Sequence, residues 1–248
     1  MTPRDPETGV PRSDDPYGFG QTLNADGYIA FKRQSTFALG LDLGQQIDPT
    51  AIAIVERIVE AKRPREIGSD LLERAAPPRY ECRWLMRMPL QTSYPDVVSF
   101  VGNRLSLPPL RQNCRLVIDA TGVGRPIVDL FARAGLRPIG VTITAGDSEH
   151  RDPDGSQNYR VAKIVLVSRL QALLHSGALA IARSLPEQPA LVSELQNFRA
   201  SISDLGNASF GARQGAHDDL VLALAIALWY LAGPQSGTGR MRVLPLEL

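Results

Sequence analysis

Between residues 114 and 122 the sequence reads Cys114-Arg115-Leu116-Val117-Ile118-Asp119-Ala120-Thr121-Gly122. A short aliphatic run that ends on an aspartate is typical of a central parallel strand, buried on both faces of a sheet. Residues 122–134 then give a turn and a helical pattern. Ligands bind at the carboxyl ends of strands in open α/β sheets. The stretch therefore predicts an α/β fold with Asp119 at a functional edge of the sheet.

The segments around this strand continue the same pattern. Strands are expected at 36–43, 50–59, 79–88, 115–119 and 137–143, and helices at 95–105, 122–134, 158–176, 189–200 and 216–232. Three strands in hairpin succession, followed by alternating helices and strands, predict a five-stranded mixed sheet with helices on both faces.

Composition divides the 248 residues into three parts. Residues 1–35 are rich in Pro, Gly, Asp and Arg and show little periodicity, which predicts a flexible N-terminal arm. Residues 233–248 follow a Gly-Pro break and predict a C-terminal tail. Between them, residues 36–232 are expected to form one domain.

Charge and residue usage exclude several classes of protein. Lys and Arg number 27 against 26 Asp and Glu, so the chain is not of the kind that coats nucleic acid, although a local basic groove is compatible with this balance. Two cysteines without zinc-site spacing indicate reduced thiols. The sequence has neither an apolar run of membrane-spanning length nor an apolar signal region, so we expect a cytoplasmic protein without a membrane partner.

A second aspartate ends an apolar run at residues 37–44, Phe37-Ala38-Leu39-Gly40-Leu41-Asp42-Leu43-Gly44. A charged residue in such a run is costly to bury unless it is paired or bound to a metal ion. The alternative is that Asp42 caps the turn at Gly44. The residues alone leave both interpretations open.

A third acidic position, His217-Asp218-Asp219, opens the apolar run that starts at Leu220. Aspartate is favoured at a helix N-cap, but capping needs only one. We expect Asp218 to be the cap and an auxiliary ligand, and Asp219 to be the main ligand, since Asp219 shares a face with small Ala223. Asp218 has a similar apolar face, so the reverse assignment stays open.

Carboxylates that converge from separate strand and helix ends can hold two hard divalent cations for phosphodiester cleavage. Asp42 with Asp218 and Asp219 would then hold the ion that activates water, and Asp42 with Asp119 the ion that stabilises the leaving 3′-oxygen. The sequence thus predicts a nuclease. A nucleotide-binding turn at Gly122 and Gly124 is the competing interpretation, but Ile127 stands where the third glycine would be.

Three segments together resemble the nuclease domain of phage large terminase subunits: Gly40-Leu41-Asp42-Leu43-Gly44, residues 117–124 with Asp119, and residues 217–225 with Asp218 and Asp219. Residues 161–179 are similar to that family's stretch before its last motif. The resemblance covers residues 36–232. It implies an RNase H-like fold, similar to Holliday-junction resolvases, in which Asp42, Asp119 and one or both of Asp218 and Asp219 bind two Mg²⁺ or Mn²⁺ ions.

The resemblance also implies a function and partners. The expected activity is metal-dependent cutting of double-stranded DNA during genome packaging, in the host cytoplasm if the chain is phage-encoded. No G-x-x-x-x-G-K-[ST] motif occurs in the sequence, so we expect the chain to be either an excised domain or a stand-alone nuclease that uses the motor of another chain. We expect a separate packaging ATPase, portal or small terminase subunit as partner. A junction resolvase and a non-catalytic packaging module remain alternatives.

Three basic residues are expected to contact DNA, namely Lys163, Arg160 and Arg125. The plain alternative for Lys163 and Arg160 is that they belong to the solvated face of the helix expected at 158–176.

Overall fold

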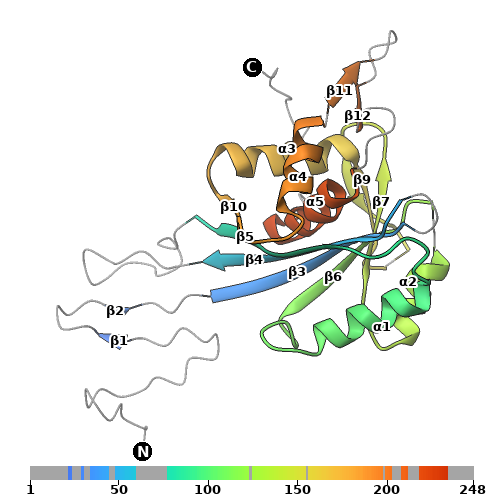
Figure 1. The fold of residues 1–248 in the computed structure, drawn as a ribbon, viewed down its shortest axis with the longest axis horizontal. Helices are drawn as coiled ribbons and strands as arrows, with labels where there is room; N and C mark the ends of the chain where they lie inside the picture. Colours follow the sequence, from blue (N-terminus) through green and yellow to red (C-terminus); the bar gives the residue numbers. More distant parts are fainter. Residues whose placement is uncertain are drawn as a thin grey trace, which may run out of the picture. The chain divides into compact units, whose positions relative to one another are not determined.

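The computed structural model describes residues 22–23, 29–30, 34–44, 48–59, 77–122, 125–154, 156–197, 199–202, 208–211 and 218–233 (Figure 1). The chain divides into two compact units, residues 1–36 with 57–79 and residues 37–56 with 80–248. Every candidate site residue belongs to the second unit. Most of the expected arm and all but the first residue of the expected tail lie outside the described residues, so those boundaries stay predictions.

The second unit is built on one mixed sheet. Its strands are β3 (Gln34–Asp42), β4 (Ala51–Val59), β5 (Arg79–Arg87), β6 (Cys114–Asp119), β7 (Ile139–Thr144), β8 (Glu149–Arg151), β9 (Tyr159–Ala162) and β10 (Leu179–Ile181), in the order β10-β5-β4-β3-β6-β7-β9-β8. Strands β3, β6, β7 and β9 are mutually parallel, β10 is parallel to β5, and β8 is antiparallel to β9. The predicted α/β class with a mixed sheet is confirmed.

The predicted number of strands was wrong, because the sheet has eight strands and not five. The three that sequence reasoning missed, β8, β9 and β10, have only three or four residues each. So short a run does not distinguish a period of 2 from one of 3.6. The other short strands pair as β1 (Thr22–Leu23) with β2 (Ile29–Ala30), and β11 (Arg199–Ile202) with β12 (Ala208–Gly211).

Five helices are described: α1 (Tyr94–Leu105), α2 (Arg125–Arg133), α3 (Lys163–His175), α4 (Gln188–Asn197) and α5 (Asp219–Ala232). All five differ from the expected bounds, α1 by one residue at its start and α2 because the expected range includes a turn before the helix. The helix expected at 158–176 begins at Lys163, because the residues before it pair with β7 as β9. The helix expected at 189–200 ends at Asn197, before β11. The last helix begins at Asp219, and residues 216 and 217 lie outside the described part.

Helices cover both faces of the sheet, as predicted (Figure 1). On β3, Ala38 packs into the core formed with α3, α4 and α5, whereas Leu39 and Leu41 pack into the core on the side of α1 and α2. Side chains alternate across a strand, so Gly40 and Asp42 lie on the same face as Ala38. That face is the one covered by α5.

Helix α5 lies unusually close to β3 at Gly40. A Cβ atom at Gly40 would stand 2.0 Å from the carbonyl oxygen of Ala223, so no other residue fits there. Asp219 is one helical turn before Ala223, and Asp42 is two residues after Gly40 on the same face. The close contact therefore brings the start of α5 to the carboxyl end of β3. In the described part of the chain, no helix combines the length and the hydropathy of a membrane span.

Candidate metal centre

Parallel pairing places two of the predicted carboxylates side by side. The register of β3 and β6 pairs Leu41 with Ile118, so Asp42 and Asp119 follow at the same level on neighbouring strands. Both strands end at these residues. Both side chains lie on the face covered by α5, because Val117, two residues before Asp119, belongs to the same core as Ala38. The carboxyl edge of the sheet thus carries an aspartate pair, as the sequence predicts.

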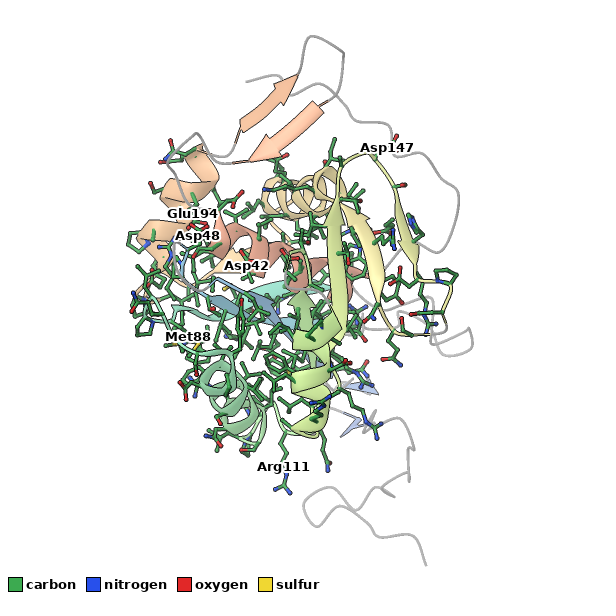
Figure 2. The ribbon with its side chains drawn as sticks, turned by 90° about the vertical axis from the view of Figure 1, so that its right-hand side faces the viewer. Asp42, Asp48, Met88, Arg111, Asp147 and Glu194 are labelled. Atoms are coloured by element: carbon green, nitrogen blue, oxygen red, sulfur yellow. The ribbon has the colours of Figure 1, made fainter. Side chains whose placement is uncertain are left out.

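Asp42 is coupled to every other predicted carboxylate. Burial raises its pKa well above the ordinary value, and the charges of Asp119, Asp219 and Asp218 raise it further, whereas Lys163 lowers it. Among the residues that the structure describes, no hydrogen bond or ion pair reaches the Asp42 carboxylate (labelled in Figure 2). A half-buried carboxylate that is surrounded by like charges and has no partner among the described residues favours a nearby cation or a proton.

Asp119 is 7% exposed and has one fixed oxygen. The backbone N–H of Thr121 donates to Asp119 Oδ1 over 2.8 Å. Burial raises the pKa of Asp119, and its hydrogen bonds with Thr121 and the charge of Lys163 only partly offset this effect. The turn after β6 therefore orients the carboxylate.

Asp218 occupies the N-cap position of α5, as expected, but its side chain does not cap the helix, so that part of the prediction was wrong. It stands at the N-cap position without a side-chain hydrogen bond to the helix. Its Oδ2 instead accepts from Lys163 Nζ over 2.7 Å. A charge-assisted contact is stronger than one with a neutral amide, which accounts for the preference. Lys163, the first residue of α3, is thus a member of the site.

Asp219 is 4% exposed and is held by Arg87, the last residue of β5. Arg87 Nε donates to Asp219 Oδ2 over 2.7 Å, and Nη2 donates to Oδ1 over 3.2 Å. The same Nη2 contacts Glu194 Oε1, and Nη1 lies 3.6 Å from Glu187 Oε2. Burial lowers the pKa of Arg87, but the hydrogen bond and charge of Asp219 and the charges of the two glutamates raise it above its ordinary value.

Glu194 performs the capping that Asp218 does not. Its Oε2 accepts from the backbone N–H of Val221, in the first turn of α5, over 3.0 Å. Burial raises the pKa of Glu194 to about 7, partly offset by the hydrogen bond to Val221. Sequence reasoning missed Glu194 and Arg87. The one available signal was the spacing of Glu194 three residues after buried Leu191, which puts both on one helical face.

Of the remaining predicted DNA contacts, Arg160 does not join this cluster. Arg160 lies on β9, is 58% exposed and donates to Asp152 over 3.1 Å. The side chain of Arg125 and the whole of His217 lie outside the described residues. Lys163 lies beside the carboxylates, and a role in DNA binding stays a prediction for all three basic candidates.

The donor set fits hard divalent cations. Across the described residues, no three Asp, Glu, His or Cys side chains form a ready metal site, in keeping with the contacts of Asp219 and Asp218 to Arg87 and Lys163. The donors are carboxylate oxygens, which Mg²⁺ and Mn²⁺ prefer. The described part of the cluster contains two basic side chains, Arg87 and Lys163. It contains six acidic side chains, namely Asp42, Asp119, Asp218, Asp219, Glu187 and Glu194. The negative charges of the cluster therefore exceed its positive charges, which favours the binding of a further cation.

Comparison with known proteins identifies the fold. No protein-family model and no curated protein matches the sequence. The large terminase nuclease of thermophilic phage G20c is similar in structure, with 18% identity, a TM-score of 0.52, and coverage of 87% of this chain and 92% of that one. Its magnesium-bound form is 19% identical (TM-score 0.50), and its cobalt-bound form is 20% identical (TM-score 0.50); both comparisons cover 81% of this chain and 86% of that one. The resemblance expected from the sequence is thus confirmed for the fold: this chain has the RNase H-like fold of the large terminase nuclease domains.

Proposed function

We infer that this protein is a metal-dependent DNA endonuclease of the large terminase type, which cuts DNA during genome packaging. The observation that carries the proposal is Asp42. Its carboxylate stands beside three others, without a hydrogen-bond partner among the described residues, on the sheet edge where the fold binds ligands. A purely structural role explains an aspartate that caps a helix or forms an ion pair. It does not explain Asp42.

The four aspartates would hold two Mg²⁺ or Mn²⁺ ions. Asp42 would bind both ions, one together with Asp119 and the other together with Asp218 and Asp219. The magnesium-bound G20c nuclease, which has the same fold, supports this choice. Such ions, when bound, activate a water molecule and stabilise the leaving 3′-oxygen. The protein contributes orientation: Thr121 fixes Asp119, and α5 presents Asp218 and Asp219 together.

DNA and the packaging machinery are the proposed partners. Lys163 has 25% of its side chain exposed beside the carboxylates, where an ammonium group can contact a backbone phosphate. Double-stranded DNA is the proposed substrate, and a packaging ATPase, portal or small terminase subunit the proposed protein partner. The proposed location is the cytoplasm of the host.

A plasmid-nicking assay tests the proposal. The purified chain is incubated with supercoiled DNA and Mg²⁺, Mn²⁺ or EDTA, next to an Asp119→Asn variant. We expect nicking with either metal and none with EDTA or with the variant. Metal-independent nicking, or wild-type nicking by Asp119→Asn, contradicts the proposed site.

A further inference from the structure

One guanidinium in the candidate centre is shared by three carboxylates. Arg87 contacts both oxygens of Asp219, one oxygen of Glu194 and, at 3.6 Å, Glu187. The side chain of Arg87 is 23% exposed, whereas those of Asp219 and Glu194 are 5% and 6% exposed. Both oxygens of the aspartate expected to be the main metal ligand are therefore occupied by a fixed cation of the protein.

Glu194 and Glu187 can bind the Arg87 guanidinium without Asp219. Glu194 is anchored independently of Asp219, because its second oxygen accepts from the amide of Val221. Glu187 is on the outer side of the guanidinium and is 31% exposed. Arg87 can therefore release Asp219 while it keeps two carboxylate partners that it already contacts.

We propose that Arg87 is a built-in counter-ion that competes with a divalent cation for Asp219, and that Glu194 and Glu187 receive it when the cation binds. The inference rests on the proposed metal site. A cation on Asp219 would stand within a few ångströms of the guanidinium, where like charges repel strongly. Arg87 thus sets the metal affinity of the centre and neutralises Asp219 in the metal-free protein.

A double substitution, Arg87→Gln with Glu194→Gln, tests the competition. It removes one positive and one negative charge together, so the net charge of the cluster is unchanged, and Asp219 is the carboxylate that loses its counter-ion. Glutamine at position 194 keeps an acceptor for the Val221 amide. The readouts are calorimetric titration with MnCl₂ and the melting temperature in EDTA and in Mn²⁺.

Release of Asp219 should lower the Mn²⁺ Kd about tenfold, which corresponds to about 1.4 kcal/mol of binding free energy. The melting temperature in EDTA should fall, because Asp219 then repels Asp42 without a counter-ion, and its rise on adding Mn²⁺ should exceed that of the wild type. A matched control, Arg83→Gln with Glu56→Gln, removes an arginine–glutamate pair that meets at 2.6 Å between Arg83 on β5 and Glu56 on β4. Its Mn²⁺ Kd should equal the wild-type value.

The outcomes separate the inference from the proposed function. A wild type that binds no Mn²⁺ overturns the metal site and the inference with it. A folded double variant with equal or weaker Mn²⁺ binding overturns the inference alone. If the double variant does not fold, Arg87→Lys decides, because it keeps the charge but cannot contact both Asp219 oxygens. It should bind Mn²⁺ more tightly than the wild type, and unchanged or weaker binding refutes the competition.

Discussion

The two ends of helix α5 are each held by an arginine, half-buried Arg87 at the N-terminal end and buried Arg169 at the C-terminal end, but their charges are balanced differently. At the C-terminal end, Arg169 Nη1 donates to the carbonyl oxygens of Trp229 and Gly233 over 3.0 and 3.1 Å, and Nη2 lies 3.4 Å from Glu149. Glu149 also accepts from the indole N–H of Trp229. A cation that meets terminal carbonyls and one carboxylate is what the helix dipole favours.

At the N-terminal end, carboxylates are in excess. The dipole favours negative charge there, and one well-placed acceptor satisfies a first-turn amide that has no partner within the helix, a task that Glu194 already performs for Val221. Asp42, Asp119, Asp218 and Asp219 come in addition. The comparison indicates that the C-terminal end serves stability, whereas the N-terminal end retains mutual repulsion that a bound cation or a proton relieves.

The largest effect expected is loss of cleavage in Asp42→Asn. The change removes the shared carboxylate charge at constant size, so Mn²⁺-dependent nicking should fall by orders of magnitude. In EDTA the melting temperature should stay equal or rise, because one source of repulsion is gone. Plasmid nicking and thermal melting measure the two effects. Wild-type nicking, or a marked loss of stability in EDTA, would refute the functional interpretation of this end.

Next in size is the difference between the two aspartates of α5. Asp219→Asn should abolish nicking, whereas Asp218→Asn, on a carboxylate that is 25% exposed and paired with Lys163, should only reduce it. Asp218 makes no capping bond, so its substitution should cost less than the roughly 1 kcal/mol typical of a lost cap. Nicking rates and urea unfolding measure both. The reverse order of activities would reassign the main ligand.

The opposite pattern is expected at the other end of the helix. Arg169→Met leaves Glu149 buried without its cation and the last carbonyls without a donor, so the free energy of unfolding should fall by about 3–5 kcal/mol. Urea unfolding measures this loss. Nicking at a temperature well below melting, and the Mn²⁺ Kd, should stay near the wild-type values. A large rise in that Kd would show that the two ends are not separable.

Much of this arrangement follows from the sequence because it depends on local patterns. Aliphatic runs that end on Asp42 and Asp119 predict two parallel strands, and parallel pairing then makes the two carboxylates neighbours. The apolar run after Asp219 predicts a buried helix, and Gly40 permits its close approach. These elements carry the four predicted carboxylates.

The counter-ions could not be predicted because tertiary contacts select them. On β5, Tyr80, Cys82 and Leu85 belong to one core, so the alternation of side chains shifts by one residue before Arg87, as at a β-bulge. Simple alternation from Tyr80 would place Arg87 on the opposite face. Glu194 similarly caps a helix 27 residues away, a distance that no capping pattern covers.

The smallest effect expected is the pH dependence of stability in the metal-free protein. Burial and neighbouring carboxylates raise the pKa of Asp42 in the folded state. The folded protein therefore holds this proton more tightly than the unfolded chain does. The resulting stability is fully present below the ordinary aspartate pKa of about 3.9 and is lost as pH rises through the raised pKa.

Asp42→Asn removes this titration, so the difference in unfolding free energy between the variant and the wild type, in EDTA, should grow in favour of the variant as pH rises above about 3.9, until it passes the raised pKa of Asp42. Saturating Mn²⁺ should reverse the trend, because the cation binds the ionised carboxylate and stabilises the wild type more as pH rises. Urea unfolding at several pH values measures both series. If this difference in unfolding free energy shrinks with pH in EDTA, the protein itself stabilises the charged form of Asp42. The charges at the N-terminal end of α5 would then be as well balanced as those at the C-terminal end.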